Sequence, residues 1–178
     1  MTEGADERLI ADPVRRQRYR FSRDGEVLKV EVWADPGADV PAHHHPDQQE
    51  RFQILDGNVR FVIDGVERVA TAGDRLVADP GVTHSFENVG DAEARLSVEV
   101  EPALELQGFL EGAARLARAG KYTRRGIPRG PRAALELAVL ADDYRETTIV
   151  ASPPRIIQRL LMSPLARLGR RLGYGHDG

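Results

Sequence analysis

The chain has no cysteine among its 178 residues. This absence excludes a disulfide framework and a thiol nucleophile. Aromatic residues are scarce, at 6% of the composition, and no apolar stretch approaches the roughly 20 residues that a membrane-spanning helix needs. Residues 1–8 show no basic start followed by an apolar run, so we expect no secretory signal. A cytoplasmic protein is the resulting expectation.

Charge is distributed unevenly along the chain. Residues 1–102 hold 12 Lys and Arg against 21 Asp and Glu, a net charge of −9, whereas residues 103–178 hold 13 against 7, a net charge of +6. A basic segment of this kind could bind nucleic acid or an anionic membrane surface. Docking on the acidic part of the same chain, or on a partner subunit, explains the asymmetry equally. We expect docking, and nucleic-acid and membrane binding are the less favoured alternatives.

Histidine is concentrated in the stretch His43-His44-His45, with His84 further along the chain. The stretch is flanked by strand-like sequence, and residues two apart in a strand point to the same face. His43 and His45 therefore share a face, and His44 is expected to point away. With Glu50 and His84 these two supply three imidazoles and one carboxylate, which suit a divalent first-row transition ion better than calcium or magnesium.

Glu50 also opens an alternating segment, residues 50–55. Glu50, Phe52 and Ile54 should face the interior, and Arg51 and Gln53 should face away. The inward neighbours of Glu50 are then apolar. This pattern favours an apolar pocket beside the ion, which suits aromatic or polyketide-like substrates better than sugars.

The spacing of these residues resembles the two motifs of the cupin family. The first motif, Gly-x5-His-x-His-x4-Glu-x6-Gly, is matched by Gly37, His43, His45, Glu50 and Gly57. The second, Gly-x5-Pro-x-Gly-x2-His-x3-Asn, is matched by Gly73, Gly81, His84 and Asn88, and its proline position holds Asp79, followed directly by Pro80. The resemblance covers about the first hundred residues. It implies that the metal ligands are His43, His45, Glu50 and His84, and it leaves Fe, Mn, Ni, Cu and Zn open.

Alternating apolar residues predict many short strands before Pro102. The predicted strands are 15–21, 26–33, 58–63, 66–70, 75–79, 83–88 and 94–101. Asp56-Gly57 and Asp64-Gly65 predict hairpin turns. Short antiparallel strands with closely spaced turns indicate a mainly β fold, a closed sandwich or barrel. The cupin resemblance implies, more specifically, a double-stranded β-helix (jelly-roll) barrel.

Beyond Pro102 the apolar period lengthens to three or four residues, which is typical of helices. Gly120 is expected to stop the first helix, and Pro131 suits the first turn of the second. The predicted helices are 106–117, 131–144, and a third that starts at Ser152-Pro153 and restarts at Ser163-Pro164. We therefore divide the chain into a cupin barrel with the metal site at 1–102 and a basic helical extension at 103–178, packed on the barrel or on a partner subunit.

Three functions remain open, because cupins with this ligand set include dioxygenases, decarboxylases, isomerases, cyclases and binding proteins. The first is a metal-dependent oxidoreductase, dioxygenase-like, that acts on a small apolar or aromatic molecule. The second is a non-redox isomerase or cyclase that uses the ion as a Lewis acid. The third is a non-catalytic small-molecule-binding or regulatory protein. No catalytic residue beyond the ligands is assigned. The expected partners are a small-molecule substrate and, as the resemblance implies, a second copy in a homodimer.

Overall fold

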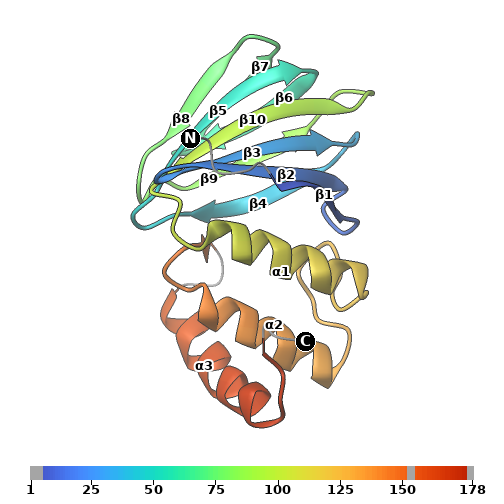
Figure 1. The fold of residues 1–178 in the computed structure, drawn as a ribbon, viewed down its shortest axis with the longest axis vertical. Coiled ribbons are helices and arrows are strands. Elements are labelled where there is room, and N and C mark those ends of the chain that lie inside the picture. Colours follow the sequence, from blue (N-terminus) through green and yellow to red (C-terminus); the bar gives the residue numbers. More distant parts are fainter. Residues whose placement is uncertain (1–5, 152–154, 176–178) are drawn as a thin grey trace.

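The computed structural model describes residues 6–151 and 155–175, in which two antiparallel sheets face each other and three helices follow (Figure 1). The first sheet contains, in spatial order, β1 (Asp6–Asp12), β2 (Gln17–Asp24), β3 (Val27–Ala34), β10 (Ala94–Glu101), β5 (Gln49–Asp56) and β8 (Arg75–Ala78). The second contains β11 (Ile149–Val150), β4 (Asp39–His44), β9 (His84–Asn88), β6 (Asn58–Ile63) and β7 (Val66–Thr71). The mainly β architecture with C-terminal helices confirms the predicted fold class.

The core lies between the two sheets and follows from the alternation of apolar residues. Every second side chain of β3 and of β10 is buried. The two strands align these buried positions in the pairs Val32↔Leu96, Val30↔Val98 and Leu28↔Val100. On β5 the predicted inward residues Phe52 and Ile54 are 3% and 1% exposed. Side chains that leave water in this way supply the main favourable term in folding.

Gly57 turns the chain from β5 into β6 with a φ of +88°. A Cβ atom on this residue would lie 2.7 Å from Cβ and 2.9 Å from Cα of Ala94. We expect Gly57→Ala to lower the free energy of unfolding by about 3 kcal/mol, because a strained φ and a backbone clash add. The matched control is Gly65→Ala, where φ is +75° and nothing lies within 4 Å. It should cost only about 1 kcal/mol, and equal losses of the two variants in urea titrations would contradict the clash.

The helices cover one side of the barrel. They are α1 (Leu106–Arg118), α2 (Pro131–Asp143) and α3 (Arg155–Arg171). Helix α1 lies between the strands and the α2–α3 pair (Figure 1). Its residues Leu106 and Ala114 belong to the core of the barrel, and Arg118 donates a hydrogen bond of 2.8 Å to the carbonyl of Ala11 in β1. Because β1 and β11 are edge strands of the two sheets, the helices close the opening between these edges.

Helix α3 is continuous from Arg155 to Arg171, with Pro164 inside it. The predicted restart at Ser163-Pro164 is therefore wrong, and the predicted start at Ser152-Pro153 falls outside the described residues. Packing against α2 explains the continuity, because buried Ala166 lies against Ala138 and Val139. Gly169 allows the same close approach, since a Cβ atom there would lie 2.7 Å from Val139.

The opposite face of α3 carries apolar side chains that reach solvent. Ile156 and Leu160 are each 70% exposed, and Leu161 is 54% exposed. No helix in the described part of the chain is both long and apolar enough to cross a membrane.

The homodimer, and the division of the chain at residue 102, stay predictions.

Candidate metal centre

Four side chains meet inside the barrel, at the side that the helices cover. They are His43 on β4, His45 directly after β4, Glu50 on β5 and His84 on β9, and their ligand atoms all lie within 4.8 Å of one another. β4 pairs with β9 so that His43 lies opposite His84, and β5 brings Glu50 from the other sheet. The four residues singled out from the sequence are therefore together in space, and the cluster does not include His44.

Each of the three histidines is held through its Nδ1 atom by a backbone carbonyl. Nδ1 lies 2.8 Å from Pro41 O in His43, 2.6 Å from Thr147 O in His45, and 3.0 Å from Val82 O in His84. A carbonyl oxygen only accepts, so each Nδ1 carries the proton. In a neutral imidazole the Nε2 atom then presents a lone pair. Backbone carbonyls that accept from Nδ1 in this way commonly orient metal-binding histidines in proteins.

Glu50 places a carboxylate against two of these nitrogens. Its Oε2 lies 2.9 Å from Nε2 of His84, and its Oε1 lies 3.3 Å from Nε2 of His45. A lone pair facing a carboxylate oxygen at this distance is repulsive unless a cation, either a proton or a metal ion, lies between them. His45 and Glu50 are 2% and 7% exposed, so little water is present to screen the contact. The site is built to hold positive charge.

The pKa values follow from this contact. Burial raises the pKa of Glu50, but its contacts with His45 and His84 outweigh burial and hold the pKa well below its usual range. Burial lowers the pKa of His45, but the Glu50 carboxylate outweighs it and the pKa is raised. At His43, burial together with the neighbouring His84 and His45 lowers the pKa to about 3. Glu50 is thus an anion, and His43 a neutral imidazole, over the ordinary pH range.

The residues fit a transition-metal ion. Nε2 of His45 is buried and has no hydrogen-bond partner in the described part of the chain, which is the state expected of a ligand atom. The donor set of three imidazole nitrogens and one carboxylate suits Fe, Mn, Ni, Cu or Zn. Such a cluster could bind a metal ion in a protein of this fold, and it does not fix which one.

A mainly apolar cavity of about 350 Å³ adjoins the cluster. All four cluster residues line it. Its apolar walls come from the barrel and from the helices, in the residues Val30, Val32, Phe52, Phe86, Val98, Val100, Leu106, Phe109, Leu110, Leu137 and Leu140. The apolar neighbourhood of Glu50 that the sequence predicted is present, through Phe52. Ile54 belongs to the core behind it.

The helical extension takes a direct part in the site. The carbonyl that holds His45 belongs to Thr147, and strand β11 continues from there to pair with β4, with Ile149 opposite His44 and Val150 opposite His43. The sequence analysis did not single out this segment. Its signal was the run Thr147-Thr148-Ile149-Val150, in which every residue is β-branched and therefore favours a strand.

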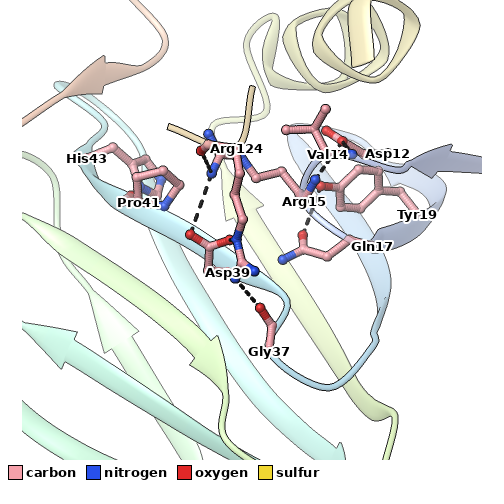
Figure 2. Close-up of polar contacts among 10 residues, drawn as sticks. All are labelled: Asp12, Val14, Arg15, Gln17, Tyr19, Gly37, Asp39, Pro41, His43 and Arg124. Atoms are coloured by element: carbon pink, nitrogen blue, oxygen red, sulfur yellow. Dashed lines mark hydrogen bonds and ion pairs between the residues drawn. The ribbon is translucent and has the colours of Figure 1, made fainter. Parts of the chain in front are cut away.

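The segment between α1 and α2, residues 119–130, also contacts the barrel. Arg124 forms an ion pair with Asp39 at 2.8 Å and donates a hydrogen bond to the carbonyl of Gly37 (Figure 2). Arg15 in turn donates to the carbonyl of Arg124 at 3.1 Å. Part of the expected docking of the basic extension on the acidic part of the chain is therefore seen here. Elsewhere the extension neutralises itself, as where Arg170 contacts Asp142 at 2.8 Å.

The polar residues beside the motifs lie outside the cavity lining. Arg51 contacts Glu99 and Glu101 on the outer face of the first sheet, at 3.4 and 3.1 Å. Glu87 forms an ion pair with Arg60 of the neighbouring strand. The expected outward direction of Arg51 agrees with these contacts.

Comparison with known proteins identifies the fold family. Residues 30–101 match the family model described as Cupin domain. The chain contains a cupin domain. The matched range holds all four residues of the cluster, and the resemblance seen in the motifs is confirmed.

A solved RmlC-like cupin from Shewanella frigidimarina NCIMB 400 has a similar fold. The TM-score is 0.52, with 24% sequence identity over 60% of this chain and 94% of that one. Two curated Streptomyces proteins are similar in sequence over 67 residues, or 38% of this chain: "Polyketide synthase CurC" of Streptomyces cyaneus at 31% identity and "Protein SchB" of Streptomyces halstedii at 33%. The match spans less than half of these relatives, 44% of the first and 49% of the second.

Proposed function

We propose that this cupin domain is a metal-dependent enzyme that oxidises a small apolar, aromatic molecule in a dioxygenase-like reaction. One observation carries the proposal. The three histidines and the Glu50 carboxylate form a cluster that lines a mainly apolar cavity of about 350 Å³. A cavity of this size suits a molecule of a few fused rings.

Different residues would bind the ion and the substrate. His43, His45, Glu50 and His84 would hold the ion, and the three backbone carbonyls at their Nδ1 atoms fix the directions of the imidazoles. The apolar walls would bind the ring system and exclude water from it. A bound transition ion supplies open coordination positions at which an organic oxygen and dioxygen can meet. The similarity to a protein named as a polyketide synthase supports a polyketide-like aromatic molecule as the substrate.

A non-redox isomerase or cyclase is the second candidate, and Asp12 favours it. This carboxyl group lines the same cavity and is 3% exposed. Burial raises its pKa, although hydrogen bonds from the backbone of Arg15 and Val14 counteract part of the rise. A carboxyl group with a raised pKa in a substrate cavity could exchange protons with a bound molecule.

Oxygen consumption separates the two candidates. The protein would be loaded with one ion at a time and given hydroxyanthrones and catechols as probe substrates in an oxygen electrode. We expect oxygen uptake to accompany product formation with one of the redox-active ions. The Glu50→Gln variant should be slower by about 100-fold or more, because loss of a ligand exceeds the 10- to 100-fold cost of losing an outer contact.

Glu99→Gln is the matched control, since Glu99 lies on the outer face and contacts Lys29 and Arg51. Its oxygen uptake should equal that of the wild type. Product formation without oxygen uptake would contradict the oxidative reaction and support the non-redox one. Binding of the probes without any product would indicate the non-catalytic alternative.

A further inference from the structure

The cavity has a second polar end, formed by β1 and β2. Gln17 and Tyr19 lie two residues apart on β2 and therefore share its inner face. With Asp12 they line the cavity, and the three residues are 2%, 5% and 3% exposed. Figure 2 shows them apart from His43, which marks the metal end. The proposed metal chemistry uses neither Gln17 nor Tyr19.

Gln17 has an unused hydrogen-bond donor at this end. The Tyr19 hydroxyl donates to Oε1 of Gln17 at 2.9 Å. Nε2 of Gln17 is buried and has no hydrogen-bond partner among the residues that the structure describes. An amide nitrogen carries two N–H donors, and buried donors in native proteins almost always have a partner. The unpaired nitrogen therefore calls for an acceptor that is not part of the chain.

Tyr19 fixes which end of the amide is left free. Burial, with a contribution from the nearby Asp12, raises the pKa of Tyr19 well above its usual value. The phenol thus keeps its proton and donates it to the amide oxygen. The Tyr19 hydroxyl donates to Gln17 and not to Asp12, whose Oδ1 accepts the backbone N–H groups of Val14 and Arg15 at 2.9 Å each. The amide oxygen is occupied by Tyr19, and in Figure 2 the nitrogen points away from Tyr19.

The surroundings indicate what the acceptor is. Val30, Val32 and Val40 line the same cavity, and Asp12 and Arg15 line it beside Gln17 (Figure 2). The molecule that meets Gln17 is therefore mostly apolar and carries its polar group at this end. A free N–H donor in a mainly apolar cavity is satisfied by an acceptor oxygen, and a ketone carbonyl supplies one on an otherwise apolar molecule. We propose that Nε2 of Gln17 donates a hydrogen bond to a ketone carbonyl of an aromatic molecule in the cavity, with Tyr19 as the residue that positions the amide. The substrate class, an aromatic ketone, rests on the proposed function above, but the binding step does not need the ion.

Two probes that differ only in the acceptor test this inference: 9-fluorenone, which carries a ketone, and fluorene, which does not. Equilibrium dialysis would measure the affinity of each probe for the full chain after removal of metal. No ion can then bind the ketone, so a difference between the two affinities reports on Gln17. We expect wild-type protein to bind fluorenone about tenfold more tightly than fluorene, the usual effect of one net hydrogen bond. In Gln17→Leu, which keeps the size of the side chain, the ratio should fall to about one.

The matched control is Gln53→Leu on the outer side of β5, which should keep the wild-type ratio. Tyr19→Phe retains the amide but frees it to rotate, so its ratio should lie between those of wild type and Gln17→Leu. This variant also decides the question if Gln17→Leu does not fold. A purely structural role for Gln17 would lower the melting temperature of Gln17→Leu and leave the ratio unchanged.

The inference would be overturned by a wild-type ratio near one, or by no binding of either probe. It would also be overturned if the tenfold ratio were unchanged in Gln17→Leu or in Tyr19→Phe. Its failure is distinct from failure of the proposed function. A protein that binds no metal could still show the tenfold ratio, and a metal-dependent enzyme could lack it.

Discussion

Wild-type protein is expected to bind about one transition-metal ion per chain, and the His84→Ala variant is expected to bind ions at least about 100-fold more weakly. His84 supplies one of the three imidazoles, and its Nε2 lies 2.9 Å from Oε2 of Glu50. Its loss removes one ligand position and one of the two imidazoles that contact the Glu50 carboxylate. Metal content would be measured by mass spectrometry on untagged protein, because a polyhistidine tag would itself bind the ion.

His44→Ala is the matched control for this experiment. It removes a histidine from the same stretch that is not a member of the cluster, so its metal content should equal that of the wild type. The ion should also stabilise the fold, by about 2.7 kcal/mol when it is present at a hundred times its dissociation constant. An unchanged melting temperature after chelation, or equal metal content in the His84→Ala and wild-type proteins, would contradict a tightly bound ion at this site.

Local rules of the sequence place three of the four residues of the metal centre, and the resemblance to the second cupin motif added His84. His43 and His45 share a face since they are two apart, and Glu50 shares the inner face of its strand with Phe52 for the same reason. Gly57 then turns the chain so that the next strand can follow. These features lie within about twenty residues, and strand periodicity is sufficient to assign their directions.

The contribution of the extension could not be predicted in this way. Thr147 reaches His45 across 102 positions of sequence, and no local period relates the two. The contact depends on how α1 and α2 pack on the barrel, which decides where the chain re-enters the second sheet. Gln17 could not be predicted for a similar reason. A glutamine in an alternating strand is common, and Gln17 differs only because its amide nitrogen is buried without a hydrogen-bond partner among the described residues.

Pro164 illustrates a local rule that tertiary packing overrides. A proline inside a helix removes one backbone hydrogen bond and usually breaks or kinks the helix. Here the turn after Pro164 is held against α2 by Ala166 and Gly169. Close packing of small residues on both helices offsets the lost hydrogen bond, so α3 continues to Arg171.

A chain that ends at Arg145 is expected to bind metal about 10- to 100-fold more weakly than a chain that ends at Ala151, because outer contacts of ligands have effects of this size. Both truncated chains lack α3. Only the shorter one lacks the Thr147 carbonyl that holds Nδ1 of His45, and strand β11 that pairs with β4. Without that carbonyl the His45 ring can rotate, and Nε2 no longer points at Glu50. Metal titration of the two chains, compared at equal helix and strand content by circular dichroism, measures the difference.

A chain that ends at Pro102 should lose more than metal affinity. It lacks α1, whose Leu106 and Ala114 are 3% and 0% exposed in the core of the barrel, so the barrel would expose apolar surface to water and aggregate or unfold. The alternative in which the extension serves only to contact a partner requires the opposite. In that case the chain ending at Pro102 would fold, bind metal as tightly as the full chain, and lose only the partner. Full metal affinity in that short chain would therefore argue for a regulatory protein and against an extension that completes the metal centre.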